Sequence, residues 1–334
     1  MNLIIPMAGR GKRLRPHTLT TPKPLVPIAG KPIVERLVRD IAGVCKDPID
    51  EIAFIIGDFG KEVEESLLKI ASELGAKGHI VYQEEALGTA HAIYCAKELL
   101  SGNVIVAFAD TLFKANFQLD AASDGIIWVK QVEDPSAFGV VKLDGNQIIT
   151  DFVEKPKEFV SDLAIIGIYY FKEGEKLREE IKNLIDQNIT SGGEYQLTVA
   201  LENLKLKGVK FVPGKVDDWL DCGNKKATVE TNKTYLTYLS ENELISKNAE
   251  INKSTIIPPV YIGDGAKIGN SVIGPHVSVG QGTTISGSVI ENSIIGEETS
   301  IDHAVLKDSM IGKNVKLKYK SADLSVGDFN EIEQ

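Results

Sequence analysis

Residues 1–25 read MNLIIPMAGRGKRLRPHTLTTPKPL, and this stretch sets the fold of the first domain. An apolar run at 3–5 leads into a turn that contains Gly9 and Gly11, and apolar residues then recur at helical spacing over 33–44. A buried strand that passes through a glycine-rich turn toward a helix is the opening unit of an α/β sheet. The backbone N–H groups of such a turn can hold an anion.

The same alternation continues to about residue 110. Continuous apolar runs at 52–56, 80–82 and 104–108 alternate with helical periodicity over 63–74 and 90–100. Apolar strands between amphipathic helices predict a parallel sheet that is covered on both faces. Ligands of such sheets bind beyond the carboxyl ends of the strands, where Gln83 and Asp110 fall.

The middle of the chain predicts a different arrangement. Strands are expected at 126–132, 139–143, 148–153 and 164–171, with a hairpin turn at Asp144-Gly145. Helices are expected at 173–186, 194–207 and 224–239. Together with the first part, these elements indicate a Rossmann-like α/β domain with a mixed sheet over residues 1–240.

Residues 241–334 have another pattern. Apolar-Gly pairs recur at 262–263, 268–269, 273–274, 279–280, 295–296 and 311–312. Such a repeat predicts a short left-handed parallel β-helix of hexapeptides, in which each coil buries its apolar face against the next. We expect about three coils over 262–317, each of roughly 18 residues. An ordinary antiparallel sheet is the alternative.

Composition narrows the class of partner. The chain of 334 residues has a formal net charge of −10, which argues against binding to nucleic acid or to an anionic membrane. Cys45, Cys95 and Cys222 form no CxxC pair and are expected to be free thiols in a reducing cytoplasm. No apolar run approaches the roughly 18 residues that a membrane span needs. We therefore expect a soluble cytoplasmic protein.

One family matches the opening stretch. The string Gly9-x-Gly11-x-Arg13-Leu14-x-Pro16, followed by Pro22-Lys23-Pro24-Leu25, resembles the G-x-G-T/S-R-L-x-P and P-K-P-L motifs of sugar-1-phosphate nucleotidyltransferases. Lys12 stands where that family has Thr or Ser, and Ala8-Gly9 where many members have Gly-Gly. The string is not a Walker loop, because Arg13 follows Gly11-Lys12, and it lacks the third glycine of a dinucleotide fingerprint.

The resemblance extends to the metal and nucleotide sites. Leu87-Gly88-Thr89-Ala90 after Gln83, Phe108-Ala109-Asp110 and Trp219-Leu220-Asp221-Cys222-Gly223 all match family segments. The resemblance implies that Asp110 and Asp221 hold Mg²⁺, with Asp217 and Asp218 as competitors for the second position. It implies nucleotide binding by these residues: Ala8, Gly9, Gly11, Arg13, Gln83, Gly88 and Thr89.

Further matches imply a sugar-phosphate site. They are Phe138-Gly139-Val140-Val141, Val153-Glu154-Lys155-Pro156 and Gly167-Ile168-Tyr169. The residues implied to face the sugar phosphate are Gly139, Glu154, Lys155 and Tyr169, although Tyr169 is equally suited to the core. Arg13, Lys23 and Lys155 are implied as the catalytic cations. Arg10 and Arg15 are expected to be solvated charges at the rim.

The implied reaction joins a nucleoside triphosphate to a hexose-1-phosphate and releases pyrophosphate. The segment at Gln83 resembles members that use dTTP or UTP with glucose-1-phosphate, and mannose-1-phosphate guanylyltransferases carry a similar string. A non-catalytic regulatory relative and an acyl-transferring β-helix, with His276 or His303 as base, are the other hypotheses. A structural or oligomerising role for the β-helix is favoured, so we expect a homo-oligomer.

Overall fold

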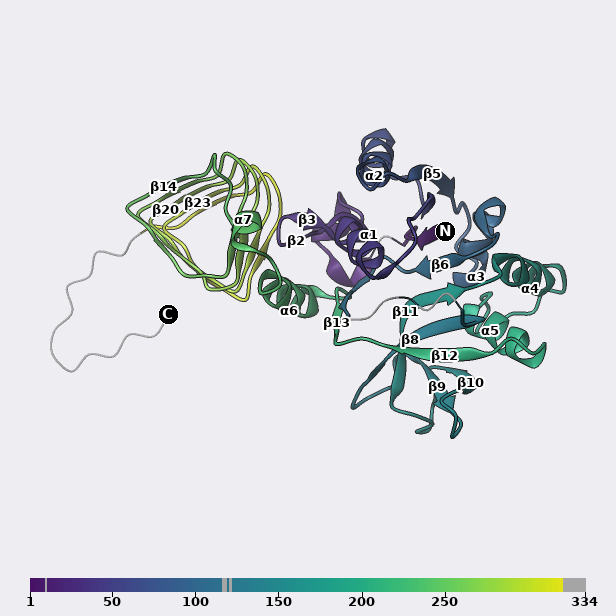
Figure 1. The fold of residues 1–334 in the computed structure, drawn as a ribbon. Helices are drawn as coiled ribbons and strands as arrows, with labels where there is room; N and C mark the ends of the chain where they lie inside the picture. The colour runs from purple at the N-terminus through teal and green to yellow at the C-terminus, as the bar shows by residue number, and fades with distance from the viewer. Residues whose placement is uncertain (10, 116–118, 120–121, 321–334) are drawn as a thin grey trace. The chain divides into compact units, whose positions relative to one another are not determined.

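The computed structural model describes residues 1–9, 11–115, 119 and 122–320, and the chain divides into two compact units (Figure 1). The first unit comprises Met1–Val26 and Lys31–Asn224. The second comprises Pro27–Gly30 and the chain from Lys225 onward. The helix that we expected to close the first domain therefore groups with the second unit.

A mixed sheet forms the centre of the first unit. Its path is β10-β9-β11-β6-β1-β4-β5, and β8 pairs with β11 on one side and β12 on the other. The pairs β6-β1, β1-β4 and β4-β5 are parallel, whereas β11 runs antiparallel to β6, β8 and β9. The strands are β1 (Asn2–Pro6), β4 (Glu51–Ile56), β5 (Lys77–Tyr82), β6 (Val104–Ala107), β8 (Gly125–Gln131), β9 (Gly139–Leu143), β10 (Ile149–Glu154), β11 (Leu163–Phe171) and β12 (Phe211–Lys215). The mixed α/β sheet that the sequence predicts is thus confirmed.

Helices cover this sheet, and those of one face share an apolar core. The helices of the unit are α1 (Ile33–Val44), α2 (Lys61–Glu73), α3 (Thr89–Cys95), α4 (Gly174–Asp186) and α5 (Leu197–Leu206). Ile93 of α3, Ile181 of α4 and Leu201 of α5 belong to one buried cluster with Ile4 and Ile55 of the sheet. Figure 1 shows α3, α4 and α5 side by side. The helix expected over 90–100 ends at Cys95 and is followed by a 3₁₀ turn at Lys97–Leu99.

Two short strands that sequence periodicity missed form a separate ribbon. β7 (Thr111–Lys114) pairs antiparallel with β13 (Asp218–Asp221). β7 begins directly after Asp110, which lies just beyond the carboxyl end of β6. It therefore joins the two sequence segments that were expected to supply the metal ligands.

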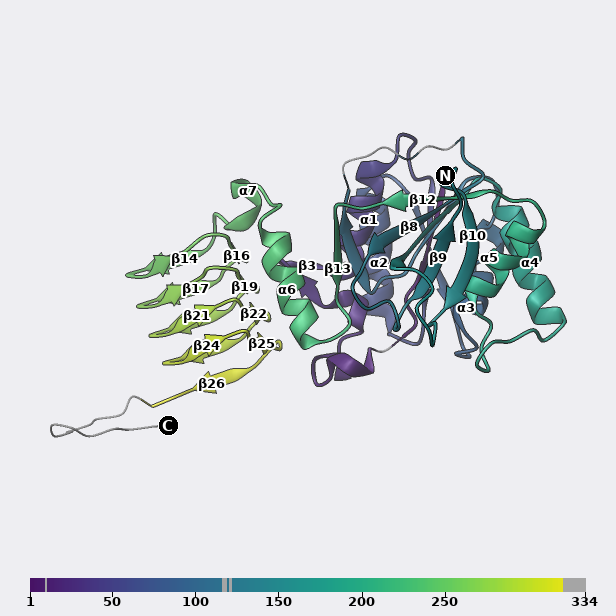
Figure 2. The ribbon, with the colours of Figure 1, turned by 90° about the horizontal axis from the view of Figure 1, so that it is seen from below.

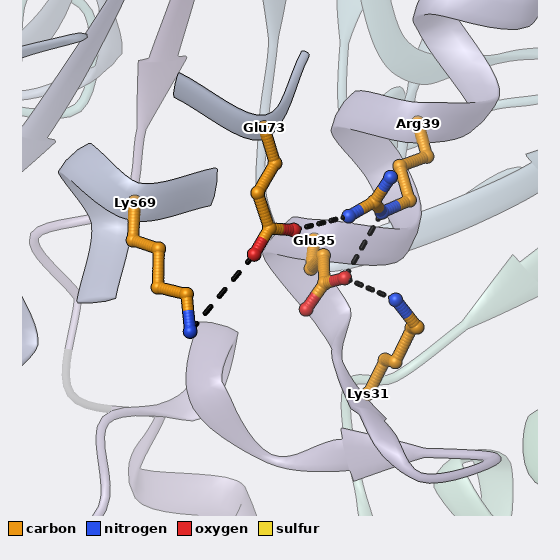
Figure 3. Close-up of polar contacts among 5 residues, drawn as sticks. All are labelled: Lys31, Glu35, Arg39, Lys69 and Glu73. Atoms are coloured by element: carbon orange, nitrogen blue, oxygen red, sulfur yellow. Dashed lines mark hydrogen bonds and ion pairs between the residues drawn. The ribbon is translucent and has the colours of Figure 1, made fainter. Parts of the chain in front are cut away.

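A chain of ion pairs links α1 to α2 on the surface (Figure 3). Glu35 accepts hydrogen bonds from Lys31 at 2.5 Å and from Arg39 at 2.9 Å. Arg39 also reaches Glu73 of α2 at 2.7 Å, and Lys69 lies 4.0 Å from the same carboxylate. Burial of Glu35 opposes ionisation, but the two cations outweigh it and lower the pKa of its carboxyl group.

The second unit is built from three parallel sheets whose strands stack coil above coil from β14 to β26 (Figure 2). One sheet contains β14 (Glu250–Asn252), β17 (Lys267–Gly269), β20 (Thr284–Ser286), β23 (Ser300–Asp302) and β26 (Lys316–Lys318). The second contains β15 (Thr255–Ile256), β18 (Val272–Ile273), β21 (Val289–Glu291) and β24 (Val305–Lys307). The third contains β16 (Val260–Ile262), β19 (Val277–Val279), β22 (Ile294–Ile295) and β25 (Met310–Ile311). The predicted β-helix is confirmed.

The three coils expected over 262–317 are present, but each is shorter than the expected length of roughly 18 residues, and one further coil precedes them. Glu250 pairs with Lys267, Lys267 with Thr284, Thr284 with Ser300 and Ser300 with Lys316, so within the described residues four coils of 16 or 17 residues precede β26. The first coil begins at Glu250, well before residue 262, because its strands carry polar residues that hid the apolar repeat. Inward positions remain in register, as in the stack of Ile268, Ile285 and Ile301.

The rest of the second unit packs beside the coils. In α6 (Lys225–Leu236), the buried Asn232 accepts hydrogen bonds from Ser278 of β19 at 2.7 Å and from the Ala29 backbone at 2.9 Å. Ala29 follows β2 (Pro27–Ile28), and α7 (Glu241–Leu244) precedes the first coil. The two-residue strand β3 (Lys31–Pro32) belongs to the first unit. Across the described part of the chain, no helix combines the length and apolarity that a membrane crossing demands.

Candidate active site

A cleft of about 1080 Å³ opens at the carboxyl ends of the parallel strands β1, β4, β5 and β6. Its walls come from the glycine turn after β1, from Gly57-Asp58-Phe59 after β4, from the segment after β5 and from Phe108-Ala109-Asp110 after β6. The predicted nucleotide-site residues that line it are Ala8, Gly9, Gly11, Arg13, Gln83, Gly88 and Thr89, together with Lys23. The structure therefore gathers segments about 100 residues apart in sequence into one cavity.

The glycine turn is fixed against Lys23. Gly11 has φ of +68°, and a Cβ atom there would lie 2.6 Å from the Cβ of Lys23, so a side chain would meet both backbone strain and a collision. Lys23 is only 6% exposed, yet its ammonium lies 3.4 Å from Oδ2 of Asp110. A nearly buried cation is thus held at the floor of the cleft beside a carboxylate. Arg10 lies outside the described residues.

The ribbon of β7 and β13 brings two aspartates together. Asp221 pairs in register with Thr111, and the backbone N–H of Cys222 donates to the carbonyl oxygen of Asp110 at 3.2 Å. The Gly223 N–H donates to Oδ1 of Asp221 at 2.8 Å, which orients that carboxylate. Asp110 and Gly223 line the cleft, and Asp221 lies two residues before Gly223 at the end of β13.

These carboxylates suit a hard divalent cation. Mg²⁺ in proteins is usually bound by one or two carboxylates, with phosphate oxygens and water completing its shell. Among the described residues no group of three or more His, Cys, Asp or Glu side chains forms a closed cage. The Asp110 carboxylate already accepts one cation, the ammonium of Lys23, at 3.4 Å.

The predicted sugar-side residues lie on neighbouring strands. Glu154 of β10 pairs with Gly139 of β9, and Oε2 of Glu154 lies 3.0 Å from where a Cβ of Gly139 would be. Lys155 has φ of 42°, its N–H donates to the carbonyl of Phe138 at 3.0 Å, and its ammonium lies 3.7 Å from Glu154. The Lys155 side chain is largely exposed, so it is available to a ligand.

Tyr169 is buried in the core of the first unit. It is 6% exposed and belongs to the main apolar cluster, with its ring edge-on to Phe108. Burial raises the pKa of its phenol, and the carboxylates of Glu154 and Asp110 raise it further. The phenol therefore lies within electrostatic reach of both Glu154 and Asp110.

Other residues of this region escaped the sequence prediction. Asp58 and Phe59 line the cleft, and the rule that places ligands beyond strand ends could have found them, since they follow β4. Trp219 donates from its indole to the hydroxyl of Thr111 and packs edge-on against Phe138, with ring centroids 4.9 Å apart. No motif signals this second contact, because it joins a loop to a ribbon across the sequence.

Fold and cleft together define an α/β protein with a glycine-rich turn after β1, one aspartate after the parallel strand β6 and a second at the end of β13. Residues 3–238 match the nucleotidyl transferase family, and the chain belongs to that family. The resemblance found from the motifs is thereby confirmed.

Curated relatives cover most of the chain. It is 33% identical over 256 residues to the bifunctional protein GlmU of Methanococcus maripaludis, across 74% of this chain and 56% of that protein. It is 31% identical to the low-salt glycan biosynthesis nucleotidyltransferase Agl11 of Haloferax volcanii, across 77% and 71%. It is 30% identical to the mannose-1-phosphate guanylyltransferase catalytic subunit beta of Drosophila melanogaster, across 78% and 71%. The chain thus spans little more than half the length of this GlmU.

Solved structures support the fold. A nucleoside-diphosphate-sugar pyrophosphorylase from Vibrio cholerae RC9 aligns with a TM-score of 0.60 at 22% identity, over 69% of this chain and 99% of that one. A UDP-glucose pyrophosphorylase complexed with UDP-glucose aligns with a TM-score of 0.57 at 23% identity, over 71% and 99%. At these identities the likeness concerns the fold alone.

Proposed function

We propose that the protein is a sugar-1-phosphate nucleotidyltransferase that uses Mg²⁺ and makes a nucleotide sugar and pyrophosphate. The observation that carries the proposal is a cleft lined by a glycine turn, Lys23 and Asp110, with Asp221 joined to Asp110 through the β7-β13 ribbon. Cations and carboxylates in this arrangement fit the transfer of a nucleotidyl group from a triphosphate to a sugar phosphate.

In the proposed reaction an oxygen of the sugar-1-phosphate attacks the α-phosphorus of the triphosphate. A new P–O bond forms as the bond from the α-phosphorus to the bridging oxygen breaks, and pyrophosphate leaves in line with the attack. The protein forms no covalent intermediate in this scheme. Its task is to position two anions that repel each other and to stabilise the transition-state charge.

Each charged side chain would contact a different part of the two substrates. Arg13 beside the glycine turn would hold the triphosphate and the departing pyrophosphate. Lys23 would contact the α-phosphate from the floor of the cleft, and Lys155 would meet the sugar phosphate. Asp110 and Asp221 would hold Mg²⁺, which neutralises charge on the reacting phosphates when bound.

Each substrate would occupy its own side of the centre. The nucleoside would lie between the glycine turn and the segment that holds Gln83 and Gly88, with the Gln83 amide facing the base. The hexose would lie against Gly139 and Glu154, whose carboxylate accepts hydrogen bonds from sugar hydroxyls. Tyr169, being buried, would support the sugar pocket from behind.

For the substrate pair we propose dTTP or UTP with glucose-1-phosphate. GTP with mannose-1-phosphate is the second candidate, favoured by the similarity to the mannose-1-phosphate guanylyltransferase subunit from Drosophila melanogaster. The test is pyrophosphate release from ATP, CTP, GTP, UTP or dTTP, each combined with glucose-1-phosphate, N-acetylglucosamine-1-phosphate or mannose-1-phosphate in the presence of Mg²⁺. Release from one or a few pairs supports the proposal, and release from none would favour a non-catalytic regulatory protein.

We further propose that the protein works in the cytoplasm as a homo-oligomer, with the β-helix as the assembling element. Val289 and Val305 on neighbouring coils are 47% and 81% exposed and pair in register, which gives the β-helix a small apolar surface that a second copy could cover. Light scattering of the intact protein tests the proposal, and a monomer at micromolar concentration would contradict it.

A further inference from the structure

His91 contacts the one side chain of the cleft that is expected to read the nucleobase. It lies in the first turn of α3, and its Nδ1 is 3.3 Å from Nε2 of Gln83. The same Gln83 nitrogen donates to the carbonyl oxygen of Gly88 at 3.4 Å. Gln83 lines the cleft, whereas His91 is not among the residues that line it. Gln83 is thus a lining side chain through which His91 can act on a ligand.

These two contacts fix which end of the Gln83 amide faces the cleft. The carbonyl oxygen of Gly88 only accepts hydrogen bonds, and Nδ1 accepts when the neutral imidazole carries its proton on Nε2. With the imidazole proton on Nε2, both partners therefore select the NH₂ group. The NH₂ and carbonyl groups of an amide point in different directions and Gln83 lines the cleft, so the oxygen is the end of the amide that remains for a ligand there.

The framework around this pair is rigid. Gly88 has φ of +116°, and a Cβ atom there would lie 2.5 Å from the carbonyl oxygen of Tyr195, so the segment is pressed against its neighbour. Tyr195 donates its N–H to Leu87, and Ala90 donates its N–H to Tyr195, at 2.8 and 2.9 Å. The hydroxyl of Thr89 accepts the N–H of Leu197 at 2.9 Å. The start of α3, and with it His91, is thereby fixed in place.

We infer that His91 is a positioning residue that sets base selectivity by holding Gln83 with its oxygen toward the base. This inference rests on the proposed nucleotide site. An acceptor at this position selects bases that present a ring N–H, namely uracil, thymine and guanine. Cytosine and adenine present a ring nitrogen that accepts, and they face the Gln83 oxygen with no hydrogen bond and with lone-pair repulsion.

The test is equilibrium binding of each of the five triphosphates with Mg²⁺ to the full-length protein and its variants. His91→Leu removes the acceptor and frees the Gln83 amide to turn over. His91→Asn keeps an acceptor close to the position of Nδ1. His79→Leu is the matched control, because His79, in β5, is also a half-buried histidine bonded to one side chain, Glu51 at 2.6 Å, and it does not line the cleft.

In His91→Leu we expect the Kd of the preferred N–H base to rise roughly threefold to tenfold, the worth of one neutral hydrogen bond. The preference for that base over CTP should shrink by a similar factor, since a turned amide can donate to cytosine. His91→Asn should restore the preference, and His79→Leu should leave it unchanged. Where turnover is measurable, KM should change while kcat stays near its wild-type value.

Three results would overturn the inference. They are an unchanged preference in His91→Leu, equal weakening of all five triphosphates, and failure of His91→Asn to restore the preference in a protein that melts at the wild-type temperature. A wild-type protein that binds N–H bases selectively but releases no pyrophosphate would contradict the proposed reaction, and reduced selectivity in His91→Leu would still support the role of His91. The two ideas therefore fail separately.

Discussion

Lys23→Met separates the catalytic role of Lys23 from a structural one. The side chain is 6% exposed and its ammonium lies 3.4 Å from Asp110. At an effective dielectric constant of about 20, an ion pair of that length is worth about 5 kcal/mol before desolvation, and burying an ammonium costs several kcal/mol in return. The net contribution of the pair to folding is therefore near zero.

Methionine keeps the apolar stem that packs against Gly11 and removes the charge. Asp110 is left without this partner, but its side chain is 57% exposed and is hydrated by solvent, so no buried charge is stranded. We expect the free energy of unfolding to stay the same or to rise by about 1 kcal/mol, which shifts the melting temperature by roughly 2–4 °C.

The turnover rate of Lys23→Met, unlike its stability, should fall sharply. Loss of a preorganised charge at the reacting phosphate should lower kcat by about 10²–10³-fold. The assays are steady-state pyrophosphate release and thermal unfolding of the same preparation. Lys215→Met, a change at a lysine of β12 exposed to solvent, is the control for loss of one positive charge. Near-normal turnover in Lys23→Met, or a loss explained by unfolding, would rule out a catalytic role for Lys23.

Three further predictions concern other parts of the molecule. Gly88→Ala introduces a Cβ 2.5 Å from a backbone oxygen, at a residue whose φ is +116°. We expect a higher KM for the triphosphate and a free energy of unfolding lower by about 1–3 kcal/mol. The control Gly75→Ala, at φ of +76° with no atom near its Cβ, should leave KM unchanged. The lowered pKa of Glu35 means that its ionisation stabilises the fold above pH of about 4.5 and that this stability is lost as the pH falls through the folded pKa. In Glu35→Gln, the free energy of unfolding, measured by denaturant titration, should therefore fall less steeply than in wild type as the pH is lowered. An unchanged dependence on pH would contradict this prediction. In the β-helix, the hydroxyl of buried Ser288 accepts the N–H of Ala304 at 3.1 Å. Ser288→Ala should therefore lower the free energy of chemical unfolding by about 1–3 kcal/mol, whereas Ser300→Ala, at an exposed position, should lower it little. Equal effects of the two variants would argue against a stabilising role of the Ser288 hydrogen bond.

Much of the fold was predictable because its strands are continuously apolar. The run at 139–143 coincides with β9, and the helical spacing over 33–44 coincides with α1. β7 and β13 were not predictable, because four-residue strands with aspartates and a threonine show no clear period. The first coil of the β-helix was missed for a similar reason, since β14 reads Glu-Ile-Asn.

The site was predictable as a set of motifs and not as a geometry. Motifs pointed to Asp110 and Asp221, but only the β7-β13 ribbon explains why residues so distant in sequence meet. The contact of Lys23 with Asp110 depends on how a loop after β1 folds back over the end of β6, which no local pattern encodes. The sequence did not predict a role for His91, because that role rests on a single hydrogen bond to Gln83 that only the structure shows.

Detection of the nucleotide sugar itself tests the central claim most directly. Purified protein would be incubated with Mg²⁺, UTP or dTTP and glucose-1-phosphate, and with GTP and mannose-1-phosphate, and the products identified by mass spectrometry. The same assay would be run on Asp110→Asn and Asp221→Asn, with Asp217→Asn as the control. We predict a nucleotide sugar from wild type and from Asp217→Asn, with a loss of about 10²-fold or more in the other two variants. A wild-type protein that forms no nucleotide sugar, or an Asp110→Asn variant that forms it at the wild-type rate, would contradict the account.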